Sequence, residues 1–137
     1  MSAMTPHRML QPAGWLRPLG SSSGVEARGP PTLLAGQVGW NEQAVIACND
    51  LVGQVRQALT NIATLLAEAG AGPEHITRMT WYLVDKQDYL LHLPQIGLVY
   101  REVIGHQFPP LTAVQVQSLM QDKALVEIEV TAVALDH

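Results

Sequence analysis

The chain has very few cysteines and aromatic residues. It contains one cysteine, Cys48, and its aromatic content is only 5% over 137 residues. A lone cysteine excludes an internal disulfide and suits a reducing compartment. Because rings are scarce, the core has to consist mainly of Leu, Val, Ile and Ala, and the 47% hydrophobic content is sufficient for one. We therefore expect an N-terminal arm or loop over residues 1–23 and a single domain over residues 24–137.

Positive charge and long apolar runs are also lacking. Eight Lys and Arg against twelve Asp and Glu give a formal charge of -4, and no basic cluster occurs. This balance argues against a nucleic-acid partner, because binding to phosphates depends on clustered cations. No apolar run approaches the ~18 residues of a membrane span, and the first residues lack a signal-peptide core. We expect no membrane association and a cytoplasmic location.

The histidines form no metal-binding pattern. None of the five has a histidine partner four residues away. A zinc site needs several such ligands at close spacing, so the sequence predicts no metal site. The serines likewise lack the His and Asp partners of a nucleophile. The histidines are His7, His75, His92, His106 and His137.

Apolar periodicity predicts an α+β fold in the order β-β-α-β-α-β-β. Apolar residues at intervals of three and four predict a helix over Leu51–Ala69, and a second helix over 87–104 should be kinked or restarted at Pro94. Alternating and β-branched residues predict the strands, the first two of which should form a hairpin-like pair around Gly29. The predicted strands cover Val25–Arg28, Thr32–Val38, Ile76–Val84, Thr112–Leu119 and Leu125–Leu135.

Two helices cover only one face of a sheet of this size. The other face must then be buried elsewhere, and a second copy of the chain is the simplest source of that surface. The sequence therefore predicts self-association.

Several short motifs follow one another in an order and at a spacing that are specific only in combination. They are Leu33-Leu34-Ala35-Gly36-Gln37, Gln54-x-x-Gln57-Ala58-Leu59-x-Asn61-Ile62, Ala69-Gly70, Tyr82-Leu83-Val84-Asp85, Phe108-Pro109, Thr112-Ala113-Val114-x-Val116 and Val126-Glu127-Ile128-Glu129. With them the chain resembles, from about Gly14 to Val133, the RidA (YjgF-like, endoribonuclease L-PSP) family of reactive-intermediate deaminases.

This resemblance implies a mixed sheet with two helices on one face, a chorismate-mutase-like arrangement. It implies a homotrimer whose sheets form an inner barrel, with small-molecule clefts between subunits. Archetypal members hydrolyse enamines and imines such as 2-aminoacrylate to a 2-oxo acid and ammonia, without metal or cofactor.

The resemblance also implies roles for two residues of the cleft. Glu127 stands at the position of the glutamate that positions water. Leu111 stands where these proteins carry the arginine that holds the substrate carboxylate. A guanidinium binds a carboxylate through two charge-assisted hydrogen bonds and leucine offers none, so we expect the archetypal 2-aminoacrylate activity to be absent.

Further residues are predicted to contact the substrate. Gly36 and Gln37 would present backbone groups and an amide, although a turn glycine and a surface glutamine have the same sequence pattern. Thr112 would donate a hydrogen bond, although threonine is also a good strand former. Ser21 and Ser22 fall where the family has a tyrosine, although serines near glycine are also ordinary connectors.

Two hypotheses of function remain open at this stage. The first is a cofactor-independent hydrolase of an enamine or imine metabolite. The second is a noncatalytic trimer that binds a metabolite or a partner protein, which the replacement of the arginine by Leu111 favours. A ribonuclease, the family's other label, ranks third because of the net charge of -4.

Overall fold

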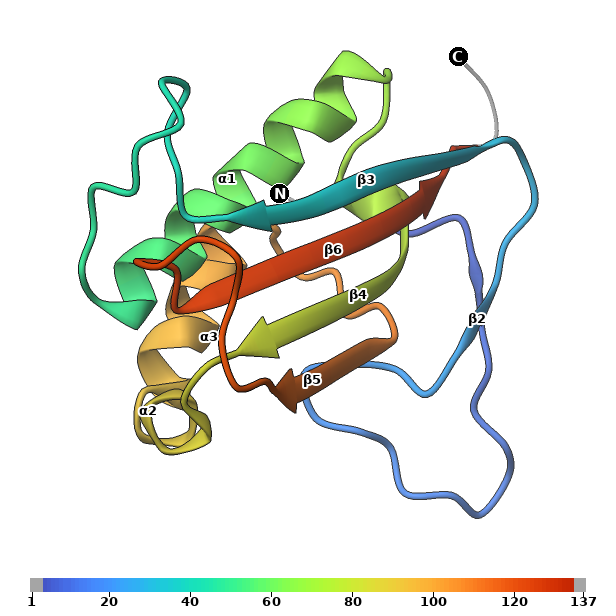
Figure 1. Ribbon diagram of the computed structural model, residues 1–137. Helices are drawn as coiled ribbons and strands as arrows, with labels where there is room; N and C mark the ends of the chain where they lie inside the picture. The colour runs from blue at the N-terminus through green and yellow to red at the C-terminus, as the bar shows by residue number, and fades with distance from the viewer. Residues whose placement is uncertain (1–3, 135–137) are drawn as a thin grey trace.

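A four-stranded mixed sheet forms one layer of the molecule, and the helices form the other (Figure 1). The computed structural model describes residues 4–134. The strands of the sheet are β3 (Pro31–Val38), β4 (Ile76–Leu83), β5 (Leu111–Gln115) and β6 (Val126–Val133). Their spatial order is β3-β6-β4-β5, in which β6 is antiparallel to both neighbours and β4 is parallel to β5.

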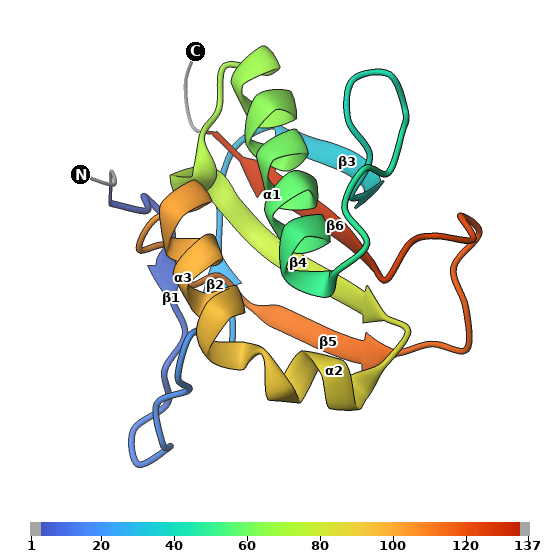
Figure 2. The same cartoon turned by 90° about the vertical axis from the view of Figure 1, so that its left-hand side faces the viewer.

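Helices α1 (Leu51–Glu68) and α3 (Leu93–Val103) cover one face of this sheet, as Figure 2 shows. The Asp50 carboxylate caps α1 by accepting a hydrogen bond from the Gly53 amide at 3.1 Å. The short α2 (Lys86–Leu91) precedes α3, and Pro94 lies in the first turn of α3. Proline needs no amide partner there, so the predicted second helix restarts at this residue.

The core lies between the helices and the sheet. Alternate residues of β4 and β6, including Trp81 and Ile128, face the apolar side of α1 and are almost fully buried. Their sequence neighbours, such as Tyr82 and Glu129, point to the opposite face, because side chains alternate along a strand. The predicted α+β class, with two main helices on one face of a mixed sheet, is confirmed.

Three details differ from the sequence-based expectation. The strand β2 is only Val25–Glu26 and pairs with β1 (Arg8–Met9), not with β3, so the predicted hairpin is wrong. The strand β4 ends at Leu83, one residue before the predicted end. The strand β5 ends at Gln115, four residues before the predicted end. Leu135 and His137, which the predictions included, lie outside the described residues.

The N-terminal segment, from Met4 on, contacts the domain. His7 is buried, and its Nε2 atom lies 2.9 Å from the carbonyl oxygen of His75, in the short 3-10 turn Pro73–His75. Within residues 4–134, no helix has the length and hydropathy needed to cross a membrane.

Candidate functional site

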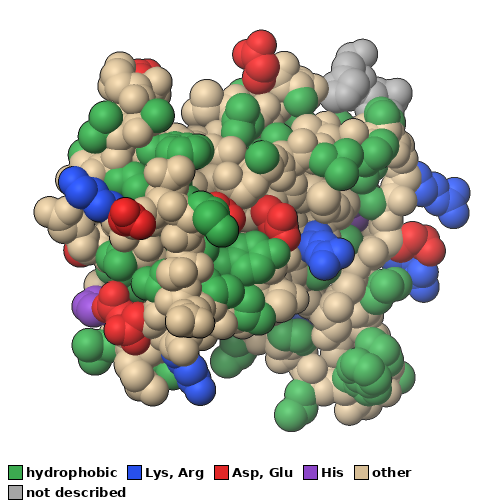
Figure 3. Space-filling model, in the orientation of Figure 1, with side chains coloured by type: hydrophobic (Ala, Val, Ile, Leu, Met, Phe, Trp, Pro, Cys, Tyr) green, Lys and Arg blue, Asp and Glu red, His purple; other side chains and the backbone are tan. Residues whose placement is uncertain are grey.

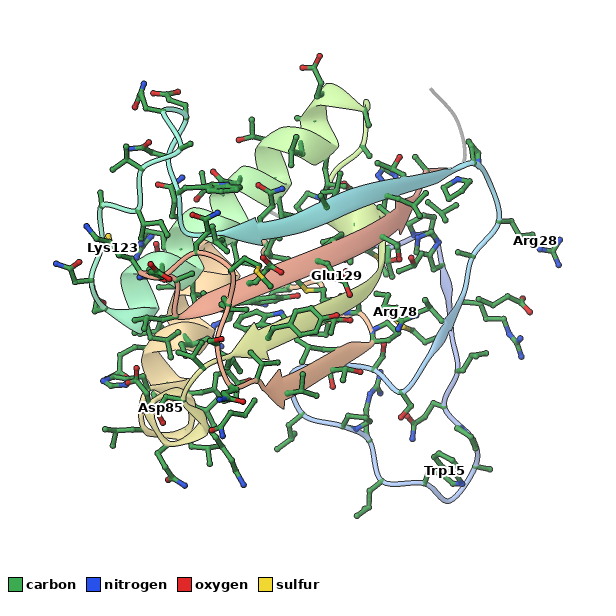
Figure 4. All side chains as sticks on the ribbon, in the orientation of Figure 1. Trp15, Arg28, Arg78, Asp85, Lys123 and Glu129 are labelled. Atoms are coloured by element: carbon green, nitrogen blue, oxygen red, sulfur yellow. The ribbon has the colours of Figure 1, made fainter. Side chains whose placement is uncertain are left out.

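The sheet face opposite the helices carries a mixed polar and apolar surface. Side chains of β4 and β6 that point away from the core, among them Arg78 and Glu129, lie on this face (Figure 4). Leu33 on β3 is 72% exposed, and Val114 on β5 is 40% exposed. Apolar and acidic side chains thus occur close together on this face of the molecule, as Figure 3 shows. We call it the open face.

A bulge in β3 brings Gly36 and Glu127 together. The register between β3 and β6 shifts between Leu34 and Gln37, so Ala35 and Gly36 have no regular partners in the ladder. A Cβ atom on Gly36 would lie 2.8 Å from the Cδ atom of Glu127. The carboxylate therefore occupies the space that any side chain at position 36 would need, which explains why glycine stands there.

Glu127 is half-buried. It makes no hydrogen bond or ion pair with any residue in the described range 4–134. Its cross-strand neighbours are Val38 on β3 and Tyr82 on β4. An unpaired carboxylate next to irregular backbone can orient a water molecule or accept its proton. The structure thus places two of the predicted site residues, Gly36 and Glu127, in contact.

Gln37 lies beside this pair but faces a different hollow. Its Nε2 atom donates a hydrogen bond to the Ala35 carbonyl at 3.1 Å. Together with Trp40 and Asn61 it lines a polar hollow between β3, α1 and the segment after β3. Its predicted contact with a substrate stays a prediction.

The second glutamate of β6 has a structural partner. Tyr82 donates a hydrogen bond from its hydroxyl to Glu129 Oε1 at 2.6 Å. This hydrogen bond, followed by burial and by the charges of Glu129 and Glu127, raises the pKa of the Tyr82 phenol, and Arg78 opposes the shift. Tyr82 therefore stays protonated at neutral pH, and Glu129 is held on the tyrosine.

Gln54 holds the start of β6 in place. This helix residue is fully buried, and its Nε2 atom donates to the carbonyls of Cys48 at 3.0 Å and Lys123 at 2.9 Å. Its Oε1 atom accepts from the Leu125 amide at 2.7 Å. Because β6 begins at the next residue, these bonds fix the strand position from which Glu127 projects.

The other predicted site residues gather at the beginning of β5. Ser22 forms a parallel bridge with Pro110, and its amide donates to the Pro109 carbonyl at 3.4 Å. Ser21 lies beside it and lines the same hollow as Phe108. The segment before the domain therefore folds back onto the Phe108-Pro109-Pro110 motif.

Leu111 and Thr112 differ in orientation. Leu111 pairs with Met79 and packs against the hydrophobic core, half-buried. Thr112 pairs with Thr80 and is exposed. Their roles in binding a substrate stay predictions.

Within one chain the two groups of site residues are separated. Glu127 pairs with Tyr82, which pairs with Val114, whereas Leu111 is three residues earlier on β5. Two strand spacings of ~4.8 Å and three residues of ~3.3 Å put the backbones at positions 127 and 111 about 14 Å apart. One chain therefore does not bring both groups around one small molecule.

Metal ligands are also missing from the described part of the chain. In residues 4–134, no three His, Cys, Asp or Glu side chains lie close enough together to hold a metal ion.

Sequence reasoning missed the roles of Gln54 and Tyr82. The signal for Gln54 was present, since a glutamine stands inside the apolar stripe of α1, where a polar side chain needs buried partners. The bond of Tyr82 to Glu129 depends on the pairing of β4 with β6, which periodicity does not reveal.

Comparison with known proteins identifies the family. The family model described as Endoribonuclease L-PSP matches residues 20–134. A RutC family protein from Pyrococcus horikoshii is 32% identical over 117 residues, which are 85% of this chain and 89% of that protein. A goat protein named 2-iminobutanoate/2-iminopropanoate deaminase is 31% identical over 101 residues, 73% of this chain and 70% of its own.

Solved structures agree with the sequence comparisons. A protein of the conserved Rid family from Yersinia pestis superposes with a TM-score of 0.83 at 29% identity, covering 93% of this chain and 98% of that one. The motif frame, the two-layer fold and the match over residues 20–134 lead to one conclusion: this chain belongs to the endoribonuclease L-PSP family, also known as the Rid or YjgF family.

Proposed function

We propose that this protein hydrolyses an imine or enamine metabolite to a carbonyl compound and ammonia, without a cofactor. The observation that carries the proposal is the half-buried Glu127 carboxylate, which lies against Gly36 without a hydrogen-bond partner among residues 4–134. The name of the goat relative, an iminobutanoate and iminopropanoate deaminase, supports the same reaction class.

In the proposed reaction Glu127 accepts a proton from a water molecule as the water oxygen attacks the imine carbon. The imine nitrogen is protonated before the attack, so the product of the attack is a neutral carbinolamine. Glu127 returns its proton to the amine nitrogen, the carbon-nitrogen bond breaks and ammonia leaves, and the hydroxyl group gives up its proton to Glu127 as the carbonyl forms. Backbone groups at Ala35 and Gly36, which are free of regular strand pairing, supply hydrogen bonds to the substrate. Leu111 supplies none, so another group of the chain has to hold a substrate carboxylate.

The direct test is ammonia release from freshly generated imines. The protein is mixed with an amino-acid oxidase that produces 2-iminopropanoate or 2-imino-4-methylpentanoate, and the decay of the imine is followed against the reaction without the protein. We expect faster decay of 2-imino-4-methylpentanoate and no acceleration for 2-iminopropanoate, which is the imine tautomer of 2-aminoacrylate. Binding of the imines without any acceleration would instead support the noncatalytic alternative, which the packing of Leu111 on the core favours.

We further propose that the cleft is completed in a homotrimer. The open face carries exposed apolar side chains, and the two groups of site residues are about 14 Å apart within one chain. Burial of this face against other copies removes apolar surface from water and lets Glu127 of one copy face the β5 edge of another.

Replacing Leu33 with glutamate tests this assembly. Leu33 is 72% exposed on the open face, so a charge there would be desolvated on association. We expect the native chain to have the mass of three chains in light scattering, and Leu33→Glu to give smaller species at micromolar concentration.

Leu91→Glu is the matched control, because Leu91 is 74% exposed and belongs to α2, away from the open face. It should keep the native mass. A monomeric native chain, or equal dissociation by both variants, would overturn the proposed assembly.

Replacing Gly36 with alanine should displace the carboxylate without unfolding the protein. The new Cβ atom would meet Glu127 side-chain atoms at 2.8–2.9 Å, and the end of a flexible side chain can move aside. A misplacement of about 1 Å can cost on the order of 100-fold in rate. We expect a thermal midpoint close to the native value and turnover lower by about tenfold or more.

Replacing Gly39 with alanine should instead destabilise the fold. A Cβ atom there would lie 2.8 Å from the Cα atom of Gln54, and the backbone of α1 cannot move aside as easily. Gly39→Ala should therefore lower the thermal midpoint. Unchanged turnover in folded Gly36→Ala would show that the position of the Glu127 carboxylate does not matter for the reaction.

A further inference from the structure

A polar hollow of about 440 Å³ lies beside the long loop that joins β3 to α1 (Figure 2). This size is within the range of small-molecule pockets. The hollow has Gln37 in common with the residues predicted for the substrate cleft and is otherwise formed by different side chains. They come from the loop, with Trp40, Asn41 and Glu42, and from α1, with Gln57, Thr60, Asn61, Thr64 and Leu65.

The loop side of the hollow has a fixed shape. The Asn41 Oδ1 atom accepts hydrogen bonds from the amides of Gln43 at 2.9 Å and Val45 at 3.1 Å. Asn61 of α1 donates through its Nδ2 atom to the Trp40 carbonyl at 2.8 Å. These bonds hold the loop together and tie it to the helix. A ligand therefore finds the hollow already formed and does not have to order it on binding.

Most hydrogen-bond donors of the helix side are already used within the chain. The hydroxyls of Thr60 and Thr64 donate to the carbonyls four residues earlier, at 2.8 Å and 2.9 Å. The Asn61 amide group donates to two carbonyls, and Gln57 Nε2 donates to Asn61 Oδ1 at 2.9 Å. What these groups still offer to a ligand is mainly the lone pairs of their oxygen atoms.

The hollow also carries a negative charge. Glu42 is exposed, and its carboxylate makes no hydrogen bond or ion pair with any residue in the range 4–134. Among the described residues that line the hollow there is no Lys, Arg or His. Such a lining favours a ligand that brings its own donors and a positive charge, since hydrogen bonds with ionised partners are the strong ones.

Trp40 adds an aromatic ring to this lining. An indole attracts a cation over its face more strongly than the other aromatic side chains do. Together with the neighbouring Leu65 it also supplies apolar surface, which can bury a short alkyl chain. The hollow therefore combines a carboxylate, acceptor oxygens and an aromatic ring.

We propose that this hollow binds a protonated primary amine with a short alkyl chain. The ammonium group donates its three N–H groups to the Glu42 carboxylate and to the amide oxygens of Gln37 and Gln57. The alkyl chain packs on Trp40 and Leu65. The inference goes beyond the proposed hydrolysis of imines and does not rest on it, because the amine is bound here and not converted.

The test uses two probes of nearly the same size, butylammonium and 1-butanol, at neutral pH and physiological salt. Binding is followed by NMR through the indole N–H signals of the three tryptophans. The Trp40 signal should shift, whereas those of the exposed Trp15 and the buried Trp81 should not. We expect millimolar dissociation constants for ligands this small, and about tenfold tighter binding of butylammonium than of 1-butanol.

Glu42→Gln should lose most of this preference, because glutamine keeps the shape of the side chain but removes its charge. The exchange breaks no contact with a described residue, so the thermal midpoint should stay close to the native value. Glu26→Gln is the matched control. Glu26 lies on β2, is exposed and does not line the hollow, so the same loss of charge should leave the preference unchanged.

Equal affinity for butylammonium and 1-butanol, or an unaltered preference in Glu42→Gln, would overturn the proposal. An equal loss of preference in Glu26→Gln, or a shift of the Trp15 signal without one of Trp40, would also overturn it. Glu127→Gln should bind butylammonium as tightly as the native chain. Amine binding and imine turnover are thus measured separately, and either one can fail while the other stands.

Discussion

Replacing Glu127 with glutamine is expected to reduce imine hydrolysis by about 10²- to 10⁴-fold, the usual contribution of a general base. Glutamine has almost the same shape but cannot accept a proton from water. The carboxylate makes no hydrogen bond or ion pair with other residues of the described chain, so its loss breaks no contact that stabilises the fold. The thermal midpoint should therefore stay close to that of the native protein while the imine-dependent rate falls.

Glu129→Gln provides the matched control. Glu129 lies on the same strand and face, and the exchange removes the same charge. Its oxygen accepts from Tyr82, and the amide oxygen of glutamine can still accept that hydrogen bond. Turnover should stay within a few-fold of the native rate. An equal loss of turnover in both variants would mean that the effect comes from the negative charge of the open face and not from Glu127 itself. Full activity in Glu127→Gln would reject Glu127 as the base.

The largest effect on stability is expected for Gln54→Leu. Leucine approximately conserves the volume of the side chain, but it leaves the Cys48 and Lys123 carbonyls and the Leu125 amide without their partner. A fully buried group left unsatisfied costs about 1–3 kcal/mol. These three bonds are only partly buried, so the lower part of that range applies, and we expect a loss of roughly 3–5 kcal/mol in the free energy of unfolding. The thermal midpoint should fall on the order of 10 °C at fixed protein concentration.

Gln57→Leu, one turn later on α1, is the control for that experiment. Gln57 is half-buried, and its Nε2 atom donates a hydrogen bond to Asn61 Oδ1 at 2.9 Å, next to a hollow that water can enter. The loss should be below about 1 kcal/mol. If Gln54→Leu were no more destabilised than Gln57→Leu, the three bonds of Gln54 would not hold the start of β6 as the geometry indicates.

Much of the fold follows from local patterns. The helix α1 was predictable because eight apolar residues recur on one side of it, and Asp50 and Gly70 mark its ends. Strand β6 was predictable because polar and apolar residues alternate along it. Strand β4 was predictable because it is rich in β-branched and aromatic residues. The hairpin of Val25–Arg28 with Thr32–Val38 was wrong because the preference of a short segment for extended structure does not identify its partner, which here is Arg8–Met9.

The candidate site was predictable only in part. The motifs indicated Gly36 and Glu127, which the structure places in contact, and their roles in binding and catalysis stay predictions. The contact of Ser22 with Pro110 was not predictable, because the two residues are 88 positions apart in the chain.

The sequence by itself determined most of the helices and strands, the composition of the core and the motifs that indicate the family. It also determined that position 111 carries no guanidinium. These properties depend on residue type and on spacing of a few positions. The tertiary structure decided which strands are neighbours and therefore which side chains meet. In the folded protein β6 lies between β3 and β4, the β3 bulge lies against Glu127, and the N-terminal segment lies next to Phe108. Such contacts join residues far apart in the chain, and burial of the whole core selects among them.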